Sequence, residues 1–448
     1  MTAALDLAER VLHRRAFEAV VWGMPAVNTE LMFQATSRAV NGDWNQIVHW
    51  SRLLDWKNQT LTPNPDAIYL MPFFNTAQAG PMVLEIPPAG EGSITGSVMD
   101  CWQTPLEDVG PAGVDKGRGG KYLILPPGHS EPVPEGHIPL LSQTHQGYAL
   151  LRSILAGGSE ADFAKALDYG RRIRLYPLAE SARPPSTTYL DAAGILFDAT
   201  IPYDVRFFES LARVVDSQPW LERDKAMIDP LRTLGIEKGK AFAPDAKTRA
   251  ILNDAAQEAR QWLDLQYEAS LSPPFYEGGH WALPTAPGLM KAMQSSFADP
   301  DSYPTDGRGT VYSMAFFCPK RSAAGSYYLM ATRDKEGRPL DGGSTYRLTV
   351  PPNVPVTQYW SATAYDRATH GLVRDVARAS RSSQSPGLQV NQDRSVDVYF
   401  GPHAPTSNES NWVPTSSHGE FEVLFRFYAP EKSLFEKNWR LPDIEKSS

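Results

Sequence analysis

Cysteine is scarce in this sequence, since Cys101 and Cys318 are the only two among 448 residues. Two residues so far apart in the chain cannot form a disulfide framework or a thiolate metal site, although one long-range bridge stays open. Long apolar runs are also missing, because no stretch approaches 18 uncharged apolar residues. Charged residues interrupt the N-terminal apolar pattern, which is unlike a signal peptide. We therefore expect a cytoplasmic protein with no membrane span.

The chain has no excess of basic residues and none of the common cofactor or metal motifs. Its 43 basic and 51 acidic residues give a net charge of −8, which argues against a general binder of nucleic acid or anionic membranes. HExxH, GxSxG, Walker and GxGxxG patterns are absent. From these absences we expect neither a metal site nor a nucleotide or redox cofactor.

Proline and aromatic residues are abundant, which favours many turns and short strands. Proline accounts for 38 of 448 residues, against a usual share of about 5%. Apolar spacing predicts an α+β chain with two antiparallel β-sandwich or jelly-roll-like domains and a helical segment between them. The expected order is an N-terminal helical hairpin broken near Pro25, a first sandwich, the helical segment and a second sandwich, at residues 1–60, 61–157, 158–272 and 273–448. In the last region we expect the first strand at 311–317.

The segment YWSATAYD at 359–366 alternates between two chemical types. In a strand, Tyr359, Ser361, Thr363 and Tyr365 share one face, while the opposite face is apolar apart from the indole of Trp360. A dry core rejects a row of four hydroxyls unless each is hydrogen-bonded. This face is therefore expected either to meet solvent or to line a polar cavity.

The segment FEVLFRFY at 421–428 alternates in the same way. Its phenylalanines and valine face a core, and Glu422, Arg426 and Tyr428 face elsewhere. An arginine beside a tyrosine in a sheet can hold an anionic group bidentately. The alternative is a salt bridge from Arg426 to Glu422 or to another acid.

Two acidic segments in the first half are further candidates. In NPDAIY, Asn64 and Asp66 can cap a turn, while Tyr69 and one acid can instead lie at a pocket mouth. In VMDCW, the Asp100 carboxyl beside Trp102 can have its pKa raised by burial and act in acid–base catalysis. The alternative role for Asp100 is to cap a loop.

Ordered short motifs make the sequence resemble a bacterial family. The segments NPDAIY, YWSATAYD, NWVP and RFY, with their flanking residues, resemble proteins that pair the domains of unknown function numbered 1254, N-terminal, and 1214, C-terminal. The resemblance covers roughly residues 20–442 and implies two sandwich-like domains packed with helices. It implies no settled reaction, and its NW-x-P motif adds Asn411 and Trp412 to the candidate binding residues.

The sequence departs from this family in two places. Many relatives carry an export signal, which is not seen here. After YWSATAYD an Arg-Tyr-Ser-like motif is usual, whereas this chain reads DVARASRSS at 375–383. A contact made by that tyrosine would be absent or replaced.

We expect an enzyme, a hydrolase or a lyase, that acts on a small polar molecule, neutral or anionic, in a cleft between domains. In this hypothesis, Asp100 or Asp66 is the general base and Arg426 anchors an anionic group. Tyr69 or Tyr365 is the proton donor or stabilises an oxyanion. The hypothesis requires these side chains to surround one shared hollow, with substrate-binding residues Asn64, Trp102, Ser361, Thr363, Asn411, Trp412, Arg426 and Tyr428. The alternatives are a non-catalytic carbohydrate or small-molecule binder and a structural protein that assembles into a homo-oligomer.

Overall fold

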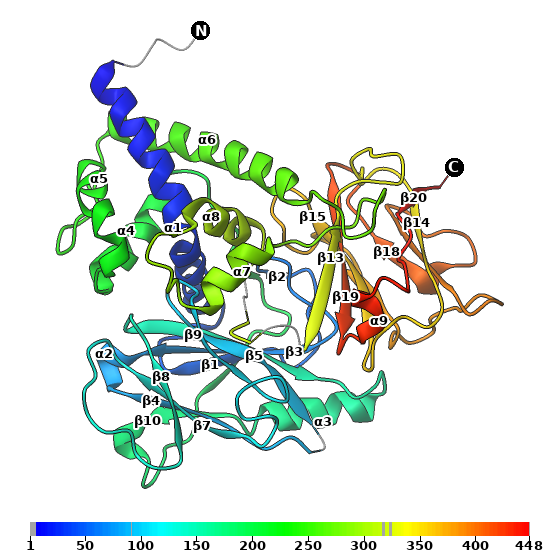
Figure 1. Cartoon of the computed structure of the whole chain (residues 1–448), viewed down its shortest axis with the longest axis horizontal. Coiled ribbons are helices and arrows are strands. Elements are labelled where there is room, and N and C mark those ends of the chain that lie inside the picture. The colour runs from blue at the N-terminus through cyan, green and yellow to red at the C-terminus, as the bar shows by residue number, and fades with distance from the viewer. Residues whose placement is uncertain (1–5, 91, 316–318, 322–324, 448) are drawn as a thin grey trace.

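The computed structural model describes residues 6–90, 92–315, 319–321 and 325–447 (Figure 1). Two β-sandwiches and a group of helices make up this part of the chain. Figure 1 shows the N-terminal sandwich below the helices and the C-terminal sandwich beside both of them. The α+β class predicted from the sequence is confirmed.

The N-terminal sandwich packs a six-stranded sheet on a four-stranded sheet. The first sheet has the order β11-β1-β3-β9-β5-β6, with β1 (Gln46–His49), β3 (Ile68–Asn75), β5 (Ser93–Asp100), β6 (Pro105–Val109), β9 (Gln146–Ile154) and β11 (Tyr189–Asp191). The second has the order β10-β4-β7-β8, with β4 (Met82–Ile86), β7 (Gly120–Leu125), β8 (His137–Leu141) and β10 (Arg174–Pro177). Alternate side chains of β3 divide as expected: Ile68 and Leu70 enter the core between the sheets, and Tyr69 and Met71 face the helices.

The C-terminal sandwich consists of two four-stranded sheets. One has the order β13-β19-β15-β16, with β13 (Ser326–Ala331), β15 (Trp360–Asp366), β16 (Ser380–Ser382) and β19 (Phe421–Tyr428). The other has the order β18-β17-β14-β20, with β14 (Tyr346–Val350), β17 (Val396–Gly401), β18 (Trp412–Pro414) and β20 (Glu445–Lys446). Trp360, Ala362 and the apolar face of β19 fill the core, which confirms the predicted faces of both strands.

Three of the four sandwich sheets are mixed, and the sheet β13-β19-β15-β16 is purely antiparallel. The pairs β1–β11, β7–β8 and β17–β18 are parallel, as is the short pair β2 (Asn58–Gln59) and β12 (Phe197–Asp198), whereas the long central strands pair antiparallel. In each sandwich sheet with a parallel pair, the chain returns through a loop and adds the parallel strand, β11, β8 or β18, at the edge. The jelly-roll topology stays a prediction.

A single long helix, α1 (Leu7–Val40), replaces the helical hairpin expected at the N-terminus. Pro25 lies inside it, where the missing N–H and the ring disfavour a helix by about 3 kcal/mol. The helix continues because it is buried all around from Ala19 to Met32. Gln103 Nε2 also donates to the carbonyl of Pro25 at 3.0 Å, which ties the helix to the turn after β5. Tertiary packing therefore overrides the local break.

The other helices lie mainly in the middle of the chain. The predicted helix at 247–270 is confirmed as α6 (Ala246–Ser270). The rest are α2 (Thr76–Ala79), α3 (Glu160–Gly170), α4 (Val205–Ser217), α5 (Ile228–Thr233), α7 (Pro287–Gln294), α8 (Thr305–Met314) and α9 (Lys432–Phe435). Within the described ranges, no helix has the length and apolar character needed to cross a bilayer.

Some strands outside residues 61–157, the range expected for the first sandwich, belong to that sandwich in the structure. β1 precedes residue 61, and β10 and β11 follow residue 157, yet all three belong to the N-terminal sheets. The prediction of a strand at 311–317 is wrong for residues 311–314, which form the end of α8. Val311 and Tyr312 pack there against α1. Residues 316–318 lie outside the described part of the chain, so Cys318 does too.

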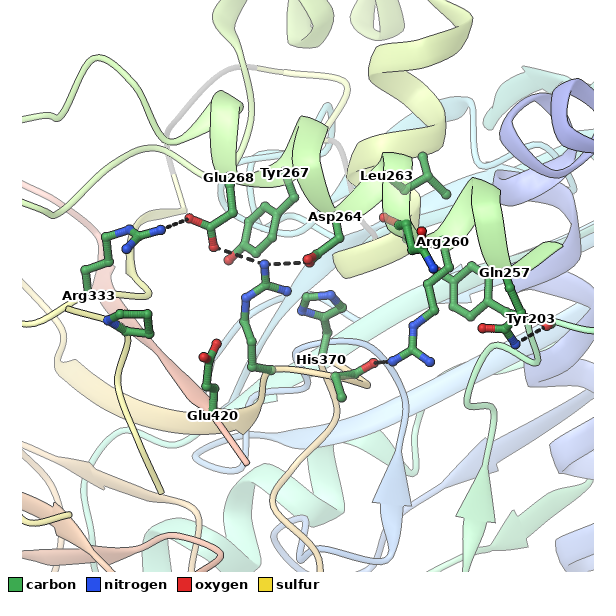
Figure 2. A pocket seen from close by; sticks show the side chains of 15 residues that line it. Tyr203, Gln257, Arg260, Leu263, Asp264, Tyr267, Glu268, Arg333, His370 and Glu420 are labelled. Atoms are coloured by element: carbon green, nitrogen blue, oxygen red, sulfur yellow. Dashed lines mark hydrogen bonds and ion pairs between the residues drawn. The ribbon is translucent and has the colours of Figure 1, made fainter. Parts of the chain in front are cut away.

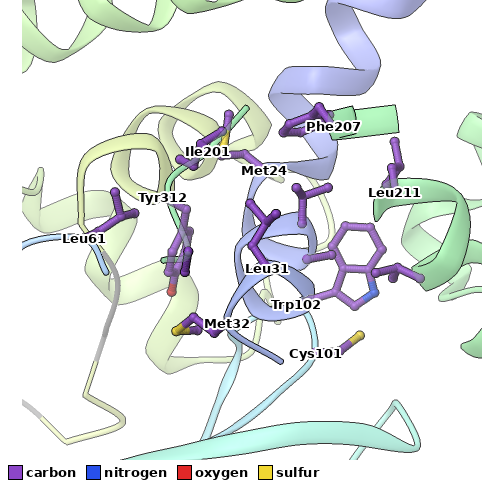
Figure 3. Close-up of a cluster of buried hydrophobic side chains, with 14 of the residues drawn as sticks. Met24, Leu31, Met32, Leu61, Cys101, Trp102, Ile201, Phe207, Leu211 and Tyr312 are labelled. Carbon is purple, nitrogen blue, oxygen red and sulfur yellow. The ribbon is translucent and has the colours of Figure 1, made fainter. Parts of the chain in front are cut away.

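The largest apolar core surrounds α1 and contains Trp102 (Figure 3). Met24, Leu31 and Met32 of α1 contribute to it, together with residues of α4 and α8. Cys101 lies in the same core as a buried free thiol. This core joins the helices to the face of the six-stranded sheet that points away from the four-stranded sheet.

Replacing Trp360 with alanine is expected to lower the free energy of unfolding by about 3–5 kcal/mol, because it empties a core position. Only 6% of Trp360 is exposed, and its ring stacks on Phe425 with 5.5 Å between centroids. Urea unfolding measures the change. The control Val390→Ala, at a side chain that is 58% exposed, should stay within about 0.5 kcal/mol of wild type. Equal midpoints for Trp360→Ala and wild type would contradict the core position.

Candidate functional site

The loop at 62–66 of the N-terminal half lies against β15 and β19 of the C-terminal half, with Asn64 at the centre. The amide Nδ2 of Asn64 donates to the hydroxyls of Tyr359 at 3.1 Å and Tyr428 at 2.6 Å. The backbone N–H of Asn64 donates to the hydroxyl of Tyr69 at 2.9 Å. One buried asparagine therefore connects tyrosines of both halves, while its Oδ1 caps the turn by accepting from the Asp66 N–H at 3.0 Å, as predicted.

Arg426 of β19 reaches the same loop from the other side. Its guanidinium donates to Thr363 Oγ1 and to the carbonyl of Thr62, both at 2.9 Å, and to the hydroxyl of Tyr365. Arg426 makes no ion pair within the described residues, so the alternative of a bridge to Glu422 is wrong. The guanidinium holds the two halves together, and its role as an anion anchor stays a prediction.

The hydroxyl row of β15 lies on one face, as predicted from its alternation. Tyr359, Ser361, Thr363 and Tyr365 are all at most 1% exposed. Ser361 lies opposite Arg426 in the sheet, and the hydroxyl of Tyr365 donates to the carbonyl of Pro63 at 2.6 Å. This face therefore meets neither solvent nor an open cavity, because the loop at 62–66 covers it.

Arg152 and Tyr328 complete this cluster and were missed in the sequence. Arg152 is paired with Tyr69 across β9 and β3, and its Nε donates to the Tyr69 hydroxyl at 3.0 Å. Burial by itself would raise the pKa of Tyr328, but the guanidiniums of Arg152 and Arg426 bring it below its ordinary value. The sequence did contain a sign of this site, because Arg152 is a charged residue within the otherwise apolar strand at 147–154. We call the whole set the tyrosine–arginine cluster: Asn64, Tyr69, Arg152, Tyr328, Tyr359, Tyr365, Arg426 and Tyr428.

Asp66 lies at the edge of the tyrosine–arginine cluster. Its Oδ1 accepts from the hydroxyl of Ser380 at 3.0 Å, and its Oδ2 is buried without a hydrogen-bond partner among the described residues. Burial raises the pKa of Asp66 to about 6, although the Ser380 hydrogen bond and the nearby Arg426 oppose the rise. Asp66 is therefore a carboxyl that changes its protonation state near neutral pH.

A cavity of about 340 Å³ lies beside Asp66, between the two halves. The N-terminal half contributes residues 53–55, 65–66 and 155–163, and the C-terminal half contributes 377–386. The halves meet closely at one wall, because a Cβ on Gly158 would lie 2.2 Å from the carbonyl oxygen of Gln384. The segment that departs from the family pattern thus supplies both Ser380 and Arg381 to this cavity.

Asp100 and Trp102 do not join this site, contrary to the expected shared hollow. Asp100 pairs with Gly147 on β9 and Tyr69 pairs with Arg152, so they lie about 17 Å apart along that strand. Burial raises the pKa of Asp100, but its Oδ1 caps a turn by accepting from the N–H groups of Trp102 and Thr104 at 2.9 and 2.8 Å. Trp102 is a core side chain, with its ring 4.6 Å from that of Trp22.

Asn411 and Trp412 also lie away from the cluster. Asn411 Nδ2 donates to the carbonyls of Gln389 and Asp397 at 2.8 and 2.9 Å, which holds a loop onto β17. Trp412 Nε1 donates to the carbonyl of Gly401 at 2.8 Å. Both side chains make contacts that stabilise the second sheet, and the structure does not bring them to Asn64 or Arg426.

Among the described residues, no group of three or more histidine, cysteine, aspartate or glutamate side chains is arranged to hold a metal ion. The chemistry at hand in the cluster is that of hydroxyls, guanidiniums and the Asp66 carboxyl. Such groups can transfer protons and stabilise negative charge.

Two domain families match the chain in sequence. Residues 44–177 match the protein of unknown function DUF1254, and residues 325–432 match the protein of unknown function DUF1214. The first range contains Asn64, Asp66 and Arg152, and the second contains Tyr328 and Arg426. The tyrosine–arginine cluster is therefore built from both domains. No curated protein matches the chain.

Solved structures resemble the chain over nearly its whole length. A protein of Vibrio parahaemolyticus, known from a crystal structure, is 17% identical with a TM-score of 0.60, and the match covers 98% of this chain and 100% of that one. A putative uncharacterized protein of Burkholderia cenocepacia is 12% identical with a TM-score of 0.42 over 98% and 94% of the two chains. The first of these shares the fold. The chain belongs to the proteins that carry the domain of unknown function 1254 followed by the domain of unknown function 1214.

Proposed function

We propose that the chain is an enzyme that acts on a small, polar, anionic molecule by acid–base catalysis, either hydrolysis or elimination. The reaction would take place in the cavity of about 340 Å³ between the two domains. Asp66 would transfer the proton. Pockets of this size between domains are common binding places for small molecules.

The proposal depends mainly on the raised pKa of the Asp66 carboxyl, which lies at the wall of this cavity. A proton-transfer group works best when its pKa lies near the working pH, and enzymes raise carboxyl pKa values by burial to achieve this. Burial raises the pKa of Asp66 to about 6. Tyr328, on the other side of Arg426, is shifted in the opposite direction. Titratable groups whose pKa values are displaced in opposite directions are typical of acid–base sites.

The charge on the cavity wall supports an anionic substrate. Arg378 and Arg381 both line the cavity, and the Nε of Arg381 is buried without a hydrogen-bond partner among the described residues. A guanidinium with unused donors suits a carboxylate, sulfate or phosphate group. Arg381 is therefore the anchor that we propose for the substrate.

In hydrolysis, the Asp66 carboxylate takes a proton from water as the water oxygen attacks the substrate, and the proton then passes to the leaving group. In elimination, the carboxylate takes a proton from carbon while the leaving group departs from the neighbouring carbon. Arg426 stabilises the carboxylate in either case, since its charge opposes the rise in the Asp66 pKa.

The test is a panel of small anionic esters, sulfates, glycosides and hydroxy acids, with product formation followed by NMR. Wild type is expected to convert at least one member, and Asp66→Asn to lose that conversion, since an amide cannot exchange the proton. The control Asp393→Asn changes an exposed aspartate on the turn before β17 and should keep full activity. Equal turnover by wild type and Asp66→Asn would contradict the role of Asp66.

A further inference from the structure

A second cavity lies apart from Asp66, between α6 and the C-terminal sandwich (Figure 2). Its volume is about 650 Å³. One face of α6 lines it with residues spaced three or four apart, namely Gln257, Arg260, Gln261, Asp264, Tyr267 and Glu268. Figure 2 shows His370 in the middle of the lining side chains. No part of the function proposed for Asp66 uses this cavity.

His370 is held by a carboxylate that is completely buried. Its Nδ1 lies 2.8 Å from Oε1 of Glu422, which is 0% exposed. The hydroxyl of Tyr267 donates to the other oxygen of Glu422 at 2.9 Å, and burial keeps the Tyr267 pKa well above its ordinary value. Arg367 Nε lies 3.9 Å from the same oxygen. Both oxygens of Glu422 therefore have hydrogen-bond partners.

This arrangement determines which ring nitrogen of His370 is available. In the neutral imidazole, a hydrogen bond donated by Nδ1 to the Glu422 carboxylate leaves the lone pair on Nε2. The Nε2 atom makes no hydrogen bond within the described residues. A buried carboxylate that orients a histidine in this way is typical of sites where the second nitrogen binds or takes a proton.

The backbone of His370 is held as firmly as its ring. Its φ of 55° lies in the left-handed region, which is uncommon outside glycine. The N–H of His370 donates to the carbonyl of Asp366, and its own carbonyl accepts from the N–H of Thr62, both at 2.7 Å. Residues in such conformations cluster at binding and catalytic sites.

The arginines of the cavity differ in how far they are neutralised. Arg367 pairs with Asp264 at 2.6 Å and with Glu268 at 3.0 Å, and Arg333 pairs with Glu268 at 3.2 Å. Arg260 makes no ion pair in the part of the chain that the structure describes. It donates to the carbonyl of Ala368 at 3.0 Å, and its guanidinium lies 5.4 Å from the ring of Tyr203. A half-buried guanidinium with unused donors attracts an anion.

Arg260 and His370 also border one smaller cavity of about 120 Å³, together with Tyr203 and Ser313. A compact molecule in this space can reach both side chains. We propose that this is a second binding site, for a small organic anion that places its charge on Arg260 and a hydroxyl or ammonium donor on Nε2 of His370.

The test titrates glycolate into protein labelled with ¹⁵N in its histidine side chains, and follows the imidazole signals by NMR. Glycolate is expected to shift the His370 signals saturably, and propionate, which has no donor, to bind more weakly. Arg260→Gln should weaken glycolate binding by about tenfold or more, because a charge-assisted hydrogen bond is lost. Arg260→Lys, which keeps the charge without the planar fork, should bind with an affinity between those of wild type and Arg260→Gln.

The matched control is Arg249→Gln, on the same helix but outside the cavity, where Arg249 pairs with Glu209 at 3.7 Å. This variant should bind glycolate as wild type does. The proposal is overturned if glycolate leaves the His370 signals unchanged, if propionate binds equally well, or if Arg260→Gln, folded by circular dichroism, binds like wild type.

Discussion

Asp66→Asn is expected to make the protein more stable at pH 8, by up to about 3 kcal/mol, while it removes turnover. The pKa of Asp66 is about 6 in the folded protein, against an ordinary value of 3.8. Between these values the folded state binds the proton more tightly than the unfolded chain does. The resulting stability is fully present below pH 3.8 and is lost as the pH rises through 6. Asparagine stays neutral and avoids this loss.

Urea unfolding of both proteins from pH 4 to pH 8 measures the effect. The two stabilities should be similar near pH 4, where Asp66 is largely protonated, and should diverge as the pH rises. The control Asp301→Asn, at an exposed position, should follow wild type across the range. A wild-type protein that is more stable than Asp66→Asn at pH 8 would mean that the carboxylate, rather than the neutral acid, is the favoured state in the fold.

Arg426→Ala is expected to lower the free energy of unfolding by about 3–5 kcal/mol. Arg426 is 2% exposed, and its charged donors bind Thr363, the carbonyl of Thr62 and the hydroxyl of Tyr365. Truncation leaves these acceptors buried without their donor and opens a cavity. Since the bond to the Thr62 carbonyl reaches the loop of the other half, we also expect the halves to unfold in separate calorimetric transitions.

Arg347→Ala is the matched control for this variant. Arg347 lies on β14 and pairs at 3.3 Å with Glu445, and both side chains are more than 40% exposed. Exposed pairs of this kind contribute about 0–1 kcal/mol. If Arg426→Ala loses no more stability than Arg347→Ala, the guanidinium does not hold the halves together.

The strand faces at the site could be predicted from the sequence because a strand has a strict period of two. The alternation at 359–366 and 421–428 correctly separates the hydroxyls and Arg426 from the core face. What covers the hydroxyl face could not be predicted. The loop at 62–66 comes from about 300 residues earlier in the chain, as the Asn64–Tyr359 hydrogen bond illustrates.

Other predictions failed because local sequence patterns do not show the tertiary contacts of a residue. Asp100 precedes an aromatic residue, which suits a catalytic carboxyl, but its oxygen caps its own turn instead. Pro25 breaks helices in isolation, yet α1 continues because it is buried all around. His370 and Glu422 are 52 residues apart, and no motif links the two, so only the folded chain brings them together.

The two sites that we propose share one structural element. The Thr62 N–H binds the carbonyl of His370, while residues 62–66 carry Asn64 and Asp66 to the tyrosine–arginine cluster. A change in this loop therefore reaches the backbone of His370 and the cavity beside Asp66 alike. The loop is thus one of the links between the N-terminal domain and the C-terminal sheet.

The most direct test of the account is a ¹³C NMR titration of the aspartate carboxyls, in which the signal absent from Asp66→Asn identifies Asp66. We predict a midpoint near pH 6, as expected for a buried proton-transfer group. A midpoint at or below the ordinary value of 3.8 would contradict the assignment of Asp66 as the acid–base group.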